Sequence, residues 1–230
     1  MKIPKTFVPE KCLEKNVEEL LSKCLTVPKT HEIDLNRLEI EPGARTKYSD
    51  RKNYTSFDKS MKILKKAGYE RHLYPWESFE LLIKYLEGKL DWRLNAIASD
   101  IRASEGNWFS MAVKREDEIL ICYNDPKNIR LSRYGEKYVV DGELKYTCKE
   151  ELAIGNIPSQ TWIKLQSFNN DFIRFFYNRS FKELPAKIRE EPAIYLPPND
   201  LLWPLAGGDR GLSICGYVPE RVSRGVRVKR

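Results

Sequence analysis

Three residues in the middle of the chain have the side-chain types that metal-dependent nucleases use. Asp125 precedes Glu143 and Lys145, which stand two positions apart in the segment VVDGELKYT, residues 139–147. Two carboxylates can hold a divalent cation, and a lysine can orient the attacking water or stabilise developing charge. The types and order of these residues therefore allow Mg²⁺-assisted cleavage of a phosphodiester.

The segment around Asp141 is also typical of a tight turn. Asp141-Gly142 lies between two β-prone runs, KYVV and ELKYT, and this dipeptide is a strong hairpin signal. On a strand, Glu143 and Lys145 would share one face and can pair with each other in solvent. We interpret Asp141-Gly142 as a structural corner. The alternative is a metal-dependent nuclease, because the three residues resemble the D-x(n)-E-x-K arrangement of restriction-type endonucleases, which implies an Mg²⁺ cofactor.

Basic side chains are concentrated in two segments of the chain. There are 40 Lys and Arg against 33 Asp and Glu, a formal net charge of +7. Residues 43–75 hold nine basic side chains and three acidic ones, and residues 221–230 hold five basic side chains and no acid. Local basic segments are typical of proteins that bind a polyanion, because each neutralised phosphate releases counterions.

These two segments supply the candidate nucleic-acid contacts. They are Arg45, Arg51, Lys52, Lys62, Lys65, Lys66, Arg71, Arg221, Arg224, Arg227, Lys229 and Arg230. The tail is mostly arginine, whose planar guanidinium group binds phosphate through paired hydrogen bonds. Two other interpretations stay open. The lysine-rich segment can be a solvated face, and Val222, Val226 and Val228 allow part of the tail to pair as an edge strand. We expect the tail to add little to the core.

Several other functions are excluded by missing motifs. Neither G-x-x-x-x-G-K-[ST] nor G-x-G-x-x-G occurs, so the sequence lacks these phosphate-binding loops. The two histidines, His31 and His72, have no nearby cysteine pair, so no zinc site is expected. We expect no cofactor, with Mg²⁺ as the alternative under the nuclease hypothesis, and the sequence favours a binding role over catalysis.

The five cysteines indicate a reducing compartment. Their number is odd and no two form a C-x-x-C pair, which fits reduced thiols better than a disulfide framework. The segment MKIPKTFVPEK lacks the apolar region of a signal peptide, and the apolar run 119–123 is too short to cross a bilayer. We expect a soluble cytoplasmic protein with no membrane partner. The low glutamine content beside many Lys and Arg is typical of heat-adapted proteins.

Helical periodicity marks the first half of the chain. Apolar residues recur at helical spacing over residues 11–25, 58–67, 76–87 and 92–105. Pro75 and Asp91 are typical of helix starts, and Gly68 and Gly88 of helix ends. The polar stretch 41–56 has no such periodicity, which predicts a linker or mobile loop.

Short strand-like runs mark the second half. WFSMAV and ILICY predict one hairpin, KYVV and ELKYT a second, and AIYL and LSICGYV two further strands around a Pro/Gly-rich loop. Helices are predicted to begin at Pro158 and Asp171 and to run near residues 184–191. The segment FNNDFIRFFYNRSF, residues 168–181, could stack unpaired bases, but its helical spacing favours a core-facing stripe with Tyr177 and Arg179 exposed.

The predicted fold class is α+β, with a helical N-terminal part followed by an antiparallel sheet with packed helices. The predicted parts are a helical segment 1–42, a linker 43–57, a main domain 58–220 and a basic tail 221–230. We expect a DNA- or RNA-binding protein that engages the phosphate backbone. The alternatives are the nuclease that uses Asp125, Glu143 and Lys145, and a protein-interaction subunit whose basic tail docks on an acidic partner. The sequence does not indicate the oligomeric state.

Overall fold

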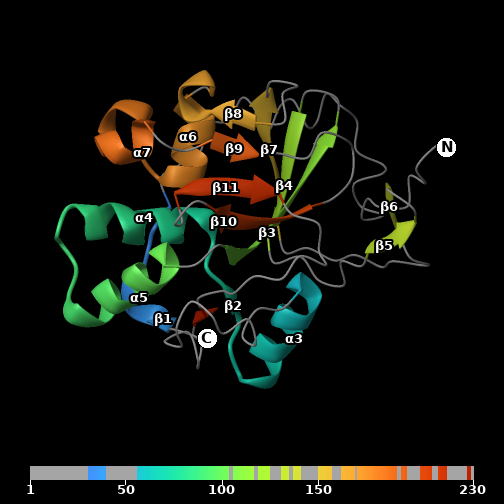
Figure 1. Ribbon diagram of the computed structural model, residues 1–230, viewed down its shortest axis with the longest axis horizontal. Helices are drawn as coiled ribbons and strands as arrows, with labels where there is room; N and C mark the ends of the chain where they lie inside the picture. Colours follow the sequence, from blue (N-terminus) through green and yellow to red (C-terminus); the bar gives the residue numbers. More distant parts are fainter. Residues whose placement is uncertain are drawn as a thin grey trace.

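The computed structural model describes residues 31–39, 56–103, 106–116, 119–124, 131–134, 137–140, 150–156, 162–168, 170–190, 193–195, 203–208, 212–216 and 227–228. Within these ranges the chain has both helices and a mixed β-sheet, as an α+β fold requires (Figure 1). The helix predicted over residues 11–25 and most of the predicted linker 43–57 lie outside the described residues.

The helices fall largely where the apolar periodicity predicts them. They are α3 (Phe57–Lys66), α4 (Pro75–Leu86), α5 (Trp92–Arg102), α6 (Asn170–Tyr177) and α7 (Ala186–Glu190), with short 3₁₀ helices at Leu35–Arg37, Leu165–Ser167 and Phe181–Glu183. Asp91 caps α5 by accepting a hydrogen bond from the backbone N–H of Leu94 at 2.8 Å. Gly68 and Gly88 follow α3 and α4 with φ angles of +81° and +68°, the left-handed conformation that favours glycine after a helix.

The strands form one large sheet, one small sheet and a hairpin. They are β1 (Leu38–Glu39), β2 (Arg71–His72), β3 (Asn107–Glu116), β4 (Ile119–Asn124), β5 (Leu131–Tyr134), β6 (Lys137–Val140), β7 (Glu150–Asn156), β8 (Trp162–Lys164), β9 (Ala193–Tyr195), β10 (Trp203–Gly208), β11 (Ser213–Gly216) and β12 (Arg227–Val228). The large sheet has the order β7-β4-β3-β10-β11-β9-β8. Its described pairs are antiparallel except β9 with β11, which is parallel. The sheet is therefore mixed rather than purely antiparallel.

The central strand β3 is buried on both faces. Phe109, Met111 and Val113 alternate along it and belong to the main hydrophobic core with residues of α4 and α6. Phe79 of α4 lies 6.3 Å from Phe109 between ring centroids. On the alternate positions, the ring of Trp108 meets Phe57 of α3 edge-on at 5.5 Å. Since successive side chains on a strand point to opposite faces, α3 covers the face of β3 that α4 and α6 leave open.

A small sheet lies below the large one in Figure 1, in the order β1-β12-β2. Strand β12 pairs antiparallel with both neighbours, so Val228 faces Leu38 on one side and Arg71 on the other. Val228 is 1% exposed and belongs to the main core. The expectation that the tail adds little to the core is wrong at this position, and the strand is central rather than at an edge.

Two other sequence predictions need correction. The helix predicted from Pro158 is absent over the described residues there, which form β8 and a 3₁₀ turn, because Ile163 and Lys164 pair with β9. The Pro/Gly-rich loop contains β10, whose Pro204 sits beside a register shift where a missing N–H is tolerated. KYVV forms strand β6, which pairs with β5. The run ELKYT, its predicted hairpin partner, lies outside the described residues.

Candidate nucleic-acid interface

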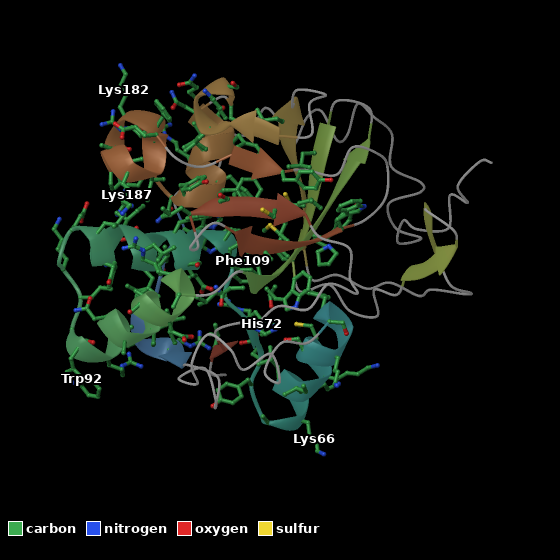
Figure 2. All side chains as sticks on the ribbon, viewed as in Figure 1. Lys66, His72, Trp92, Phe109, Lys182 and Lys187 are labelled. Atoms are coloured by element: carbon green, nitrogen blue, oxygen red, sulfur yellow. The ribbon has the colours of Figure 1, made fainter. Side chains whose placement is uncertain are left out.

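Helix α3 presents a row of lysines to solvent. Its buried side chains are Phe57, Ser60 and Leu64, which share one side of the helix. Lys59, Lys62 and Lys66 repeat the same i, i+3, i+7 spacing on the opposite side, and all three are exposed, as is Lys65. Figure 2 shows Lys66 extending away from the ribbon at the lower edge of the molecule. The predicted contacts Lys62, Lys65 and Lys66 therefore lie on one basic face, and the structure adds Lys59 to it.

A buried hydrogen-bond network fixes α3 against the rest of the protein. The hydroxyl Oγ of Ser60 lies 2.6 Å from Nε2 of His72, and both side chains are buried. The backbone N–H of His72 donates to Oγ of Ser110 on β3 at 2.8 Å. Buried polar groups of this kind are costly unless paired, so the three residues specify one position for the helix. The lysines are consequently carried by a helix with a defined orientation.

This network has no local signature in the sequence. Ser60, His72 and Ser110 come from a helix and two different strands, and they are 12 and 38 positions apart in the two hydrogen bonds. No local motif links such residues. His72, for which the sequence predicts no zinc site, is a buried residue that connects α3, β2 and β3.

Arg71 does not lie on the basic face. Its guanidinium donates two hydrogen bonds to the carboxylate of Glu77, both of 2.6 Å, and a third to the carbonyl of His72. Its Cζ also lies 3.9 Å from the centroid of the Tyr74 ring. Arg71 is 8% exposed and Glu77 is 7% exposed. The structure thus places this predicted phosphate contact in the interior, where it holds the start of α4 against β2.

The C-terminal basic segment meets the first one at the small sheet. Strand β12 pairs with β2, which directly follows α3, and the register aligns Arg227 with His72 and Val228 with Arg71. The carbonyl of Val228 also accepts a hydrogen bond from the N–H of Glu70 at 3.2 Å. Segments far apart in the sequence therefore lie side by side here. Of the predicted tail contacts, the described residues include only Arg227; Arg221, Arg224, Lys229 and Arg230 lie outside them.

The remaining predicted site residues also fall outside the described part. These are Arg45, Arg51 and Lys52 of the first basic segment, and Asp125, Glu143 and Lys145 of the nuclease hypothesis. Across the ranges that are described, no three His, Cys, Asp or Glu residues are grouped so that they could hold a metal ion. Among the helices in those ranges, none is long and apolar enough to cross a membrane.

The aromatic segment of residues 168–181 packs into the core, as its spacing predicts. Phe168, Phe172, Phe175 and Phe176 are all buried, and the Phe168 and Phe172 rings stack at 4.1 Å. Tyr177, expected to be exposed, is also buried, and burial raises the pKa of its phenol. Arg179 is half-buried and pairs with Glu80 of α4 at 2.8 Å. The buried rings of this segment are therefore used in core packing.

The described residues thus bring one lysine-covered helix and one strand of the arginine-rich tail to the same small sheet. The arrangement can supply positive charge to a polyanion. Comparison with protein-family models, with curated proteins and with solved structures finds no match to this chain.

Proposed function

We propose that the protein binds nucleic acid non-covalently, through phosphate contacts made by α3 and the arginine-rich tail around β12. The observation that carries the proposal is the pairing of β12 with β2. This pairing joins the two segments in which the basic residues of the chain are concentrated. The contacts proposed are Lys62, Lys65, Lys66, Arg221, Arg224, Arg227, Lys229 and Arg230, with Arg45, Arg51 and Lys52 contributed by the stretch before α3.

The physical reason is the additivity of phosphate contacts. A single exposed lysine contributes little, because its charge is screened by salt over about 10 Å. Several cations along one surface each displace counterions from the nucleic acid, so their effects on the binding constant multiply. On α3 the residues Lys59 and Lys66 are separated by two helical turns, which is about 10 Å along the axis. A helix face of this length can follow consecutive phosphates of one strand.

The proposal carries with it the finer features that the sequence predicts. These are a helical N-terminal part ahead of the sheet, a location in the cytoplasm, and binding without a cofactor. The experiment below tests the proposal against two alternatives. One is binding to an acidic protein partner, and the other is Mg²⁺-dependent cleavage through Asp125, Glu143 and Lys145.

The test compares two charge reversals of equal size at separate places; Figure 2 shows Lys66 at the lower edge of the molecule and Lys182 at the upper edge. One variant carries Lys62→Glu and Lys66→Glu on the exposed face of α3. The matched control carries Lys182→Glu and Lys187→Glu, which are exposed near α7. Binding of a fluorescein-labelled oligonucleotide is followed by anisotropy over a range of salt concentrations, in EDTA. The wild type should show a steep loss of affinity with salt, with a log–log slope of about −0.9 per phosphate contact on duplex DNA and about −0.7 on single strands.

The α3 variant should flatten this slope by roughly 1.5 to 2 units, because two contacts are removed, and the control should leave it nearly unchanged. Equal slopes in the two variants would remove α3 from the interface. Absence of binding at low salt would overturn the proposal and favour the acidic protein partner. If the wild type shortens the oligonucleotide when Mg²⁺ replaces EDTA, and the Glu143→Ala variant does not, the protein is a nuclease instead.

A further inference from the structure

The side chain of Trp92 stands out from the surface of the protein. It is 79% exposed, whereas Trp76 and Trp108 are 6% and 0% exposed. Helix α5 does not need this ring for packing, because Leu94, Ile97, Ala98 and Ile101 supply its buried face. A large aromatic side chain that is mostly exposed to water offers a flat apolar surface, which is the property that base-stacking residues share.

The backbone beneath Trp92 is held firmly. Asp91 caps the helix directly before it. Arg93 directly follows it and donates hydrogen bonds to the carbonyls of Leu38 and Asn36, at 2.7 and 3.4 Å. These acceptors are neutral, so the contacts anchor the first turn of α5 to β1 without neutralising the charge of Arg93. The ring of Trp92 therefore projects from a fixed position next to a cation.

This position lies at the opposite end of the small sheet from α3. Arg93 ties Trp92 to β1, β1 pairs with β12, and β12 pairs with β2 beside α3. Neighbouring strands are about 4.8 Å apart, so β1 and β2 are separated by about 10 Å. Figure 2 shows Trp92 and Lys66 both projecting from the lower edge of the molecule in this view. One polymer strand can contact both the ring and the lysines.

We propose that the nucleic acid bound at this surface is single-stranded, and that Trp92 stacks on one of its bases. The inference rests on the proposed function and specifies its ligand. In a duplex both faces of a base are covered by its neighbours, so an exposed ring gains little from it. In a single strand a base can turn outward and stack on the indole while the phosphate beside it lies near Arg93 and the rest of the strand continues toward the α3 lysines.

The experiment measures binding of a labelled oligonucleotide of about 16 nucleotides, as a single strand and as a duplex, to four proteins. These are the wild type, Trp92→Ala, Trp92→Phe and Ser99→Ala, where Ser99 is an exposed residue on the same helix. Trp92→Ala should weaken single-strand binding by about five- to a hundredfold and duplex binding by less than about twofold. Trp92→Phe should retain most of the affinity, since it keeps an aromatic face, and Ser99→Ala should match the wild type.

Two further readouts separate stacking from a general disturbance. The salt slope should be unchanged in Trp92→Ala, because no phosphate contact is lost. Tryptophan emission should be quenched by the single strand in the wild type and much less in Trp92→Phe, which decides the matter even if the alanine variant folds poorly. Normal single-strand binding by Trp92→Ala would overturn this inference and leave the proposed function standing. A wild type that binds neither form would overturn both.

Discussion

Arg71 and Glu77 form an ion pair in which each buried charge depends on the other. The two hydrogen bonds between them are 2.6 Å long, and Glu77 also accepts the backbone N–H of Tyr74 at 2.8 Å. Removing one partner of such a pair leaves an uncompensated charge in the interior, which costs more than the pair contributes when intact. Arg71 is a basic residue, but it supports the fold beneath the basic surface and is not part of that surface.

We therefore predict that Arg71→Met lowers the free energy of unfolding by about 3 to 5 kcal/mol. The double variant Arg71→Met/Glu77→Gln should recover part of this loss, because the carbonyl of the glutamine can still accept the N–H of Tyr74 and no charge remains buried. Urea denaturation measures both. The exposed pair of Arg37 with Glu70, 3.8 Å apart, is the control, and Arg37→Met should change stability by less than about 0.5 kcal/mol. Equal losses for Arg71→Met and Arg37→Met would contradict the prediction.

At the scale of elements, helix α3 is held against β2 and β3 by a few buried contacts. Phe57 meets Trp108, and Ser60 meets His72. Its other side carries lysines and the partly exposed Ile63. A helix with so narrow a buried face should open locally more readily than α4, which is buried along most of its length.

Ser60→Ala tests this dependence. The substitution removes the hydroxyl 2.6 Å from Nε2 of His72, and the loss of a buried hydrogen bond should cost about 1 to 3 kcal/mol. Hydrogen exchange followed by mass spectrometry should show that Ser60→Ala speeds exchange, relative to the wild type, more in peptides from α3 than in peptides from α4. Ser99→Ala on α5 is the matched control at an exposed serine and should change exchange in neither helix. Uniform acceleration across the protein would mean that α3 is not a separate unit.

The elements that the sequence predicts correctly are those with local signals. Pro75 and Asp91 begin α4 and α5, and the alternation in WFSMAV and ILICY matches β3 and β4. The strands β8 and β10 were assigned to a helix and a loop, because the pairing that makes them strands comes from residues distant in the chain. The same distinction holds for the candidate site. The concentration of basic residues is visible in the sequence, but the burial of Arg71 and the contact of Ser60 with His72 depend on tertiary packing.

At the scale of the whole molecule, β12 connects the C-terminal segment to the core. Val228 lies between β1 and β2 and is 1% exposed. We predict that Val228→Ala lowers the free energy of unfolding by roughly 2 kcal/mol, from lost burial and the cavity left behind. If Val228→Ala is as stable as the wild type, β12 is not an integral strand.

The two residues after Val228 should matter for binding and not for stability. Replacing Lys229 and Arg230 by glutamine should lower nucleic-acid affinity at low salt while leaving thermal unfolding nearly unchanged.

The order of the small sheet also has a consequence for synthesis of the protein on the ribosome. Strand β12 separates β1 from β2, yet it is translated roughly 150 residues after β2. At about 5 to 20 residues per second, that interval lasts roughly 8 to 30 seconds. During this time β1 and β2 have no strand between them, and the N–H of Glu70 lacks the carbonyl of Val228 as its acceptor. A nascent chain, or a product that stops short of β12, would therefore lack the completed small sheet and, with it, the surface that we propose for binding nucleic acid.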